Sequence, residues 1–174
     1  IADLPKGYQI TQLERPYCTG GGLELSVGKR VRFTRIHLEE DAGKALHVAD
    51  STLVDLNRAG VPLIEAVTEP NISSAAEARE FLSLYKELVQ YVGASDCDME
   101  KGSLRCDVNV SLRRPGEALR TKVELKNLNS FTSVEKAIAA EIERQTAAYS
   151  GGREVAQETR LYDVAADCTR PMRG

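Results

Sequence analysis

Hydrophobic and polar residues alternate along the segment Gly102–Leu112, GSLRCDVNVSL. In an extended chain with period two, the apolar residues share one side: Leu104, Cys106, Val108, Val110 and Leu112. The polar residues share the other side: Ser103, Arg105, Asp107, Asn109 and Ser111. The pattern therefore predicts a strand with one core-facing side, on which Cys106 acts as a small buried hydrophobic residue and not as a nucleophile.

The first third of the chain is predicted to consist of strands and turns. The segment Gly20–Arg30 indicates a hairpin, with a strand over residues 23–27 and a turn at Gly28. Residues 31–40 continue as an extended segment, and VPLIEAV at 61–67 indicates another strand. The triple glycine at 20–22 is not a phosphate loop, because it precedes a strand and lacks the Gly-Lys-Ser/Thr ending.

Two later segments carry helical periodicity. Ser74 followed by Glu77 is a capping box, and apolar residues then recur at helical spacing through Val92 until Gly93. A second helix is predicted over residues 134–149, with either Ser130 or Ser133 as its N-cap.

Two further strands are predicted over residues 121–128 and 154–162. The short loop RRPGEALR (113–120) joins strands 104–112 and 121–128, which favours an antiparallel pair. The order of elements predicts an α+β fold, an antiparallel sheet with two amphipathic helices packed on one face, as a single domain over residues 1–174.

Composition gives little evidence of a partner. The chain has 42% hydrophobic and 28% charged residues, a net charge of -3, and few aromatic residues for stacking bases. Residues 101–126 differ, because they contain seven Lys and Arg against three acidic residues. This local positive charge suits a phosphate-rich ligand, although a solvated basic edge would have the same composition.

The four cysteines are scattered without a C-x-x-C motif, and only two histidines are present, which argues against a structural zinc site. Reduced thiols in a cytosolic protein are expected. No apolar run is long enough to span a membrane. The chain opens without methionine and stops within a pattern at RPMRG, so we expect it to be a fragment.

If the three later strands are neighbours, their polar faces merge into one patch. It would hold the carboxylates of Asp107, Glu124 and Glu158 among Arg105, Asn109, Lys126 and Arg160. One interpretation is an ordinary solvated sheet face with cross-strand ion pairs. The other is a metal and phosphate site, since Mg²⁺ prefers carboxylate oxygens and phosphate oxygens prefer cations and forked donors.

The acidic run Glu39-Glu40-Asp41 is a further candidate. Adjacent residues of an extended chain face opposite ways, so at most one of Glu39 and Glu40 joins a given site. His37 would share a side with Glu39. A solvated turn before Gly43 is the alternative.

Four motifs in order resemble one family: RIHLEEDAGK, STLVDLNRAGVPLIE, MEKGSLRCDVNVS and TKVELKNLNSF. They are similar to the B subunit of the bacterial and mitochondrial aspartyl/glutamyl-tRNA amidotransferase. The resemblance extends from DLPKGYQI at the start to QETRLYD near the end.

The resemblance implies a fold similar to glutamine synthetase and a reaction in two steps. ATP phosphorylates the side-chain carboxylate of glutamate on tRNA(Gln), or of aspartate on tRNA(Asn), with Mg²⁺ as cofactor. Ammonia, which an amidase partner releases from glutamine, then displaces the phosphate. The implied assembly is a cytoplasmic bacterial heterotrimer, in which a small third protein accompanies the amidase. Misacylated tRNA is a partner, mostly through carboxy-terminal domains, and no membrane partner is expected.

The resemblance also suggests roles for individual residues. The expected metal ligands are Glu40, Asp107 and Glu124. Catalytic contacts with phosphate and substrate are expected from Arg105, Lys126 and Asn109. The ATP-binding residues are expected to be Glu100, Asn127, Glu158 and Arg160.

Parts of the family pattern are absent from this sequence. They are an amino-terminal strand with a Gly-Leu-Glu-x-His pattern, an Asp-Tyr-Arg-Tyr-Phe-Pro-Glu-Pro-Asp motif expected after Arg173, and the helical and tail domains that bind tRNA. We therefore expect a partial catalytic domain. Two alternatives remain: a non-catalytic docking module for the amidase or the tRNA acceptor stem, and a free-standing ligase acting on a small molecule.

Overall fold

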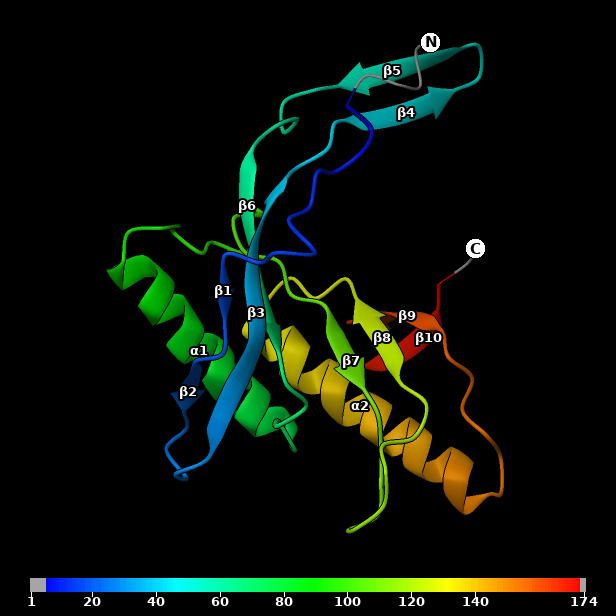
Figure 1. Ribbon diagram of the computed structural model, residues 1–174. Coiled ribbons are helices and arrows are strands. Elements are labelled where there is room, and N and C mark those ends of the chain that lie inside the picture. The colour runs from blue at the N-terminus through cyan, green and yellow to red at the C-terminus, as the bar shows by residue number, and fades with distance from the viewer. Residues whose placement is uncertain (1–5, 173–174) are drawn as a thin grey trace. The chain divides into compact units, whose positions relative to one another are not determined.

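The computed structural model describes residues 6–172 (Figure 1). Residues 1–5, where the motif DLPKGYQI begins, and residues 173–174 lie outside the described residues. The chain divides into two compact units, Ile1–Asn71 and Ile72–Gly174. The single catalytic domain expected from the sequence stays a prediction, and each unit is described by itself below.

The first unit is built around one long strand, β3 (Arg30–Glu40). It pairs antiparallel with β1 (Cys18–Thr19), β2 (Gly22–Glu24) and β6 (Pro62–Thr68). The predicted hairpin with a turn at Gly28 is confirmed, and Gly28 has the positive φ of 74° that favours glycine. The first strand of that hairpin ends at Glu24 and not at residue 27, because Leu25 already bonds across the turn to Lys29.

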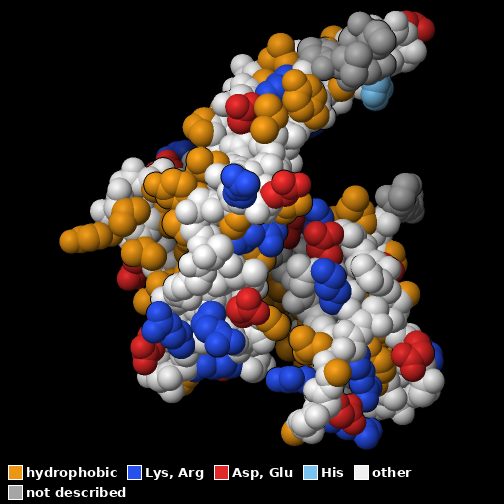
Figure 2. Space-filling view, viewed as in Figure 1, with side chains coloured by type: hydrophobic (Ala, Val, Ile, Leu, Met, Phe, Trp, Pro, Cys, Tyr) orange, Lys and Arg blue, Asp and Glu red, His pale blue; other side chains and the backbone are white. Residues whose placement is uncertain are grey.

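A second hairpin, which the sequence pattern did not predict, joins β3 to β6 in the first unit. Its strands are β4 (Lys44–Val48) and β5 (Ser51–Asp55), paired antiparallel. Leu46 and Leu53 face each other across the pair and are 43% and 56% exposed. Hydrophobic side chains are visible on its surface (Figure 2). A hairpin exposed on both sides lacks the alternation that marks a half-buried strand.

The second unit contains the two helices and a four-stranded sheet. The helices are α1 (Ala75–Tyr91) and α2 (Phe131–Ser150). The sheet has the order β10-β9-β8-β7. Its strands are β7 (Val108–Val110), β8 (Val123–Lys126), β9 (Thr159–Asp163) and β10 (Cys168–Pro171). Helix α2 packs on the sheet through β7 and β10, and α1 packs beside α2 (Figure 1).

The α+β class is confirmed, and one detail of the sheet differs from the expectation. β7–β8 and β9–β10 are antiparallel, but β8–β9 are parallel. The parallel pair follows from connectivity, because α2 carries the chain from the end of β8 back to the start of β9. The likeness to the glutamine synthetase fold stays a prediction.

Both predicted helix starts are observed. The Ser74 side chain accepts the backbone N–H of Glu77, and the Glu77 carboxylate accepts the N–H of Ser73. Helix α2 selects Ser130, whose side chain accepts the N–H of Ser133. Each cap thus satisfies backbone donors that the first helical turn leaves unpaired.

The core of the second unit lies between α2 and the sheet. Its buried side chains include Val110, Val123, Leu125, Leu128, Val134, Ala137, Ile138 and Tyr162. Strand β7 is shorter than the predicted 104–112, and β9 begins at Thr159 instead of Glu154. Among the described residues, neither helix is apolar enough over sufficient length to cross a membrane.

Candidate active site

The polar face predicted for the central strands is present in the second unit. Asp107 and Asn109 are exposed, whereas Val110 is buried. Asn109 is the register partner of Glu124 across the antiparallel pair β7–β8. Partners in register project from the same face, so the merging of the two polar faces is confirmed.

Lys126 joins the two carboxylates of this face. Its Nζ lies 3.3 Å from Asp107 Oδ2 and 3.5 Å from Glu124 Oε1. Burial acts to lower the pKa of Lys126, but the charges and hydrogen bonds of Asp107 and Glu124 outweigh it, and the pKa is raised. The two carboxylates therefore converge on one cationic atom.

A polar hollow of about 490 Å³ opens beside Glu124. It is lined by Asn109, Lys122, Glu124, Gln157, Glu158 and Thr159. Thr159 Oγ1 donates to Glu124 Oε2 at 2.8 Å, and the Glu124 N–H donates to the carbonyl of Glu158 at 3.1 Å. The hollow thus brings the predicted residues Asn109, Glu124 and Glu158 to one place.

Arg160 takes a different position from the one the sequence suggested. Its register partner is Leu125, so it projects from the buried side of the sheet, toward α2. The position beside Glu124 on the open face belongs to Thr159. The guanidinium reaches the rim of the hollow only through Glu158, whose Oε1 accepts from Arg160 Nη1 at 2.6 Å.

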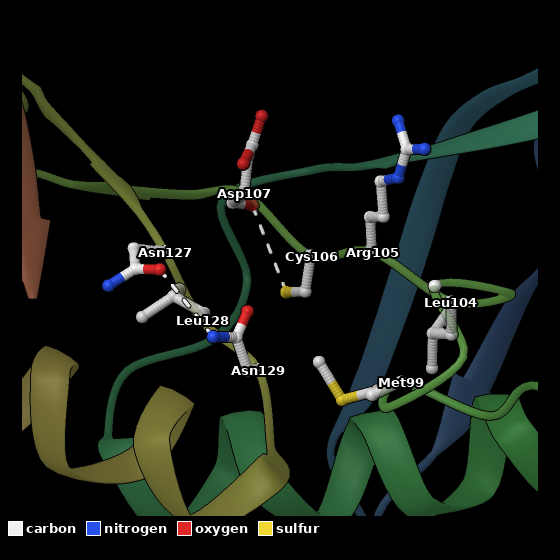
Figure 3. Close-up of a pocket in the computed structure, with 9 residues that line it drawn as sticks. Met99, Leu104, Arg105, Cys106, Asp107, Asn127, Leu128 and Asn129 are labelled. Atoms are coloured by element: carbon white, nitrogen blue, oxygen red, sulfur yellow. Dashed lines mark hydrogen bonds between the residues drawn. The ribbon is translucent and has the colours of Figure 1, made fainter. Parts of the chain in front are cut away.

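A second, smaller hollow of about 240 Å³ lies on the other side of the segment before β7 (Figure 3). Met99, Leu104 and Cys106 point into it, whereas Arg105 and Asp107 point away. Burial, with a contribution from the charge of Asp107, raises the pKa of the Cys106 thiol to about 12. The interpretation of Cys106 as a packing residue is consistent with this neutral state.

Asn127 and Glu100 lie near the small hollow in different ways. Asn127 lines it, has a φ of 66°, and donates from its side-chain amide to the Tyr162 carbonyl at 3.2 Å. Glu100 is exposed in the turn before Gly102, where its N–H donates to Asp98 Oδ1. Only Asn127 is therefore positioned to contact a group bound in this hollow.

Glu40 belongs to the first unit, where its carboxylate lies 2.9 Å from Lys6 Nζ. It follows Glu39 at the end of β3 and takes the opposite face, as the alternation requires. Asp41, the last acid of the run, is buried and pairs with Arg58 at 2.7 Å. The acidic run is therefore more than a solvated turn.

The structure also shows a cluster that the sequence did not reveal, formed by His37, Glu39 and Glu65. His37 is fully buried, and its Nε2 lies 3.1 Å from Glu39 Oε1 and 3.0 Å from Glu65 Oε2. Glu65 joins because it pairs in register with His37 across β3 and β6. Pairing the two predicted strands antiparallel would have been the signal that finds it.

The chemistry of this cluster is compatible with a proton as well as with a metal ion. Arg35 Nε donates to His37 Nδ1 at 3.3 Å. A neutral imidazole that accepts at Nδ1 carries its proton on Nε2, which then donates to the two carboxylates. A metal ion bound at Nε2 would require the proton to move to Nδ1 and Arg35 to turn away.

The oxygens of the sheet face suit a hard divalent cation. Asp107 and Glu124 already converge on the Lys126 ammonium, and carboxylate oxygens are the donors that Mg²⁺ prefers. Together, fold and site define an α+β protein with an acid- and lysine-lined site on one face of a sheet.

The family comparison gives the affiliation. The family described as the GatB/GatE catalytic domain matches residues 1–174, so the chain belongs to it. This confirms the resemblance of the four motifs.

Several curated relatives are each named as the B subunit of aspartyl/glutamyl-tRNA(Asn/Gln) amidotransferase. The protein of Persephonella marina is 53% identical over 175 residues, covering 98% of this chain and 37% of the relative. Those of Elusimicrobium minutum and Thermus thermophilus are 56% and 55% identical, covering 98% of this chain and 36% of each relative. The chain thus spans little more than a third of the length of these relatives.

Proposed function

We propose that this chain is the catalytic part of a tRNA-dependent amidotransferase. In this proposal, ATP phosphorylates the side-chain carboxylate of glutamate on tRNA(Gln) or of aspartate on tRNA(Asn), and ammonia then replaces the phosphate to give the amide. The names of the relatives and the family description support it. The observation that carries it is the convergence of Asp107, Glu124 and Lys126 beside a polar hollow of about 490 Å³.

The charges of this face suit the proposed reaction. Phosphoryl transfer from ATP to a carboxylate brings several anions together, so cations must offset their repulsion. Lys126 and Lys122 supply positive charge from β8 and the residue before it, and Arg105 supplies it from the segment before β7. Asn109 adds an uncharged amide that orients a ligand by hydrogen bonds.

Asp107 and Glu124 would hold Mg²⁺ in this proposal, with Glu158 at the rim of the same hollow. The ion supplies positive charge to the phosphate oxygens when bound. Asn127 would contact the nucleotide from the smaller hollow. Glu40 and Glu100 remain proposed ligands of the metal and of ATP, and the His37, Glu39 and Glu65 cluster is a further candidate for a cation.

The proposed partners follow from the names of the relatives, each of which denotes one component of a larger complex. An amidase would supply ammonia, and a small third protein would complete a heterotrimer in the bacterial cytoplasm. The net charge of -3 offers no general attraction for tRNA, which suits binding of tRNA mainly by parts of the protein outside this chain.

The test uses the full-length protein assembled with its partner proteins. Glu124→Gln keeps the size of the side chain but removes the charge that would bind a metal. We expect formation of Gln-tRNA or Asn-tRNA, and ADP release that depends on charged tRNA, to fall about 10- to 100-fold. Glu143→Gln, an exposed position on α2, is the matched control and should leave both rates unchanged.

The outcomes separate the competing functions. Normal amide formation by Glu124→Gln in an intact complex would favour the docking module. ADP release that continues without tRNA in the presence of a small carboxylate and ammonia would favour a small-molecule ligase. Either result would contradict the proposed function.

A further inference from the structure

A network of charged and polar side chains lies buried between α2 and the strands β9 and β10, behind the polar hollow. Its centre is Glu141 of α2, which is 0% exposed. Arg144 Nη2 and Gln145 Nε2 donate to Glu141 Oε1 at 2.7 and 2.8 Å. Arg144 Nε and Thr169 Oγ1 donate to Glu141 Oε2 at 2.9 and 2.8 Å. A fully buried carboxylate is thus hydrogen-bonded at both oxygens.

Glu141 is an anion in this environment. Burial acts to raise its pKa, but the hydrogen bonds from Arg144, Gln145 and Thr169 outweigh burial, and the pKa is lowered. Removing a partner from such a buried charge is costly, so the network has little freedom to rearrange. It forms a rigid support behind the sheet.

A chain of hydrogen bonds leads from Glu141 to the hollow. The Thr169 hydroxyl donates to Glu141 and accepts from Arg160 Nε at 2.9 Å. Arg160 Nη2 donates to the Thr169 carbonyl at 2.7 Å, which fixes the plane of the guanidinium. The remaining edge of Arg160 then donates through Nη1 to Glu158 Oε1 at 2.6 Å.

Glu158 is the last member of this chain and lines the hollow with Glu124. Its backbone carbonyl accepts the N–H of Glu124, so the two residues are held together at the main chain as well. Glu124 is oriented separately, by Thr159. Each carboxylate of the pair is therefore held by its own donor.

We propose that Glu141, acting through Thr169 and Arg160, is a positioning residue that holds the Glu158 carboxylate beside Glu124 and thereby sets the affinity of the hollow for a divalent cation. The proposal deepens the proposed function and rests on it, because it concerns the metal that Asp107, Glu124 and Glu158 would bind. None of the three supporting residues contacts the metal itself. They act as the groups behind metal ligands do, by fixing the orientation of a ligand.

The test measures Mn²⁺ binding by electron paramagnetic resonance in the full-length protein with its partner proteins. The reference is the class of Mn²⁺ site that Glu124→Gln removes. Thr169→Val keeps the shape of residue 169 but deletes the hydroxyl that joins Arg160 to Glu141. We expect it to weaken this class of site about 10-fold or more. Arg160→Lys, which keeps the charge but loses the fork, should have a similar effect.

Two controls separate positioning from simple destabilisation. Thr169→Ser retains the hydroxyl and should bind Mn²⁺ within about twofold of the wild type. Val134→Ala, which truncates a buried side chain of α2 outside the network, should lower Tm but leave Mn²⁺ affinity unchanged.

The results distinguish the two levels of the proposal. If Mn²⁺ affinity depends on Glu124 but not on Thr169 or Arg160, the positioning role is overturned and the proposed function stands. If all variants weaken binding in proportion to their loss of Tm, the network is only structural, and the positioning role is likewise overturned. If no Mn²⁺ site depends on Glu124, the metal site of the proposed function fails and the positioning role fails with it.

Discussion

The Cys106 thiol illustrates how a single residue is controlled by the side of the strand on which it lies. It points into the small hollow on the side opposite Arg105 and Asp107 (Figure 3). Burial removes water from the thiolate, and the Asp107 carboxylate repels it, so the pKa is raised to about 12. A thiol in this state is a poor nucleophile at neutral pH.

The raised pKa predicts how alkylation of Cys106 depends on pH. An unfolded thiol with a pKa of about 8.5 is half ionised at pH 8.5, whereas a group with a pKa of about 12 is ionised about a thousandfold less. Carbamidomethylation of Cys106 in the native protein should rise about tenfold per pH unit from 8.5 to 10.5. Peptide mass spectrometry measures the rate. The same thiol in urea is the control and should reach a plateau above pH 9.5, and a plateau below pH 10 in the native protein would contradict the prediction.

Some site residues could be predicted from the sequence because the polar face depends only on local alternation. Asp107, Asn109 and Glu124 share a face wherever two such strands pair. Arg160 could not be placed this way, because the strand 154–162 lacks clean alternation and its facing depends on the register with β8. His37 and Glu65 meet only through the pairing of β3 and β6, which no local pattern encodes.

At the scale of elements, α2 begins at Ser130, although Ser133 satisfied the sequence pattern equally well. The structure decides between them, since Ser130 has extended backbone angles and its side chain accepts the N–H of Ser133. Ser133 lies inside the first turn, where its hydroxyl only accepts from Ser130 at 2.9 Å. The two serines are therefore a matched pair for testing the cap.

Ser130→Ala should destabilise the protein by about 1 kcal/mol, because it leaves the N–H of Ser133 without its acceptor. Ser133→Ala should cost less than about half of that, since alanine is a better helix former inside the turn. Chemical denaturation of both variants measures the difference. Equal losses, or a larger loss for Ser133→Ala, would contradict this assignment of the cap.

The helices were predictable from their caps and periodicity, and the strands less so. Glycine and serine signals are local, so α1 and both ends of α2 follow from a few residues. The direction of β9 relative to β8 is set by the crossover through α2, and β10 is short with a mixed pattern. Such features depend on contacts distant in sequence, which composition does not determine.

At the scale of the whole molecule, burial is unevenly distributed. β8 and α2 supply fully buried side chains, whereas every described residue of β4 is exposed. A two-stranded hairpin with both faces in water is only marginally stable by itself. The chain therefore combines a well-packed region with one that opens easily.

This contrast predicts a difference in hydrogen exchange. Amides of the β4–β5 hairpin should exchange through local opening, well before those of α2, which need the packed core to open. Exchange followed by mass spectrometry on the full-length protein, with and without its partner proteins, measures both regions. Protection of the hairpin equal to that of α2 in the protein without partners would contradict the prediction.

The ion pairs of Lys126 have a further consequence for the proposed reaction. Its ammonium neutralises Asp107 and Glu124, at 3.3 and 3.5 Å, so the resting face does not hold two uncompensated anions. A divalent ion that takes both carboxylates would release the ammonium a few ångströms from the place where phosphate arrives. The site would then exchange one counter-ion for another, and the arrival of the metal would itself prepare the lysine to receive the nucleotide.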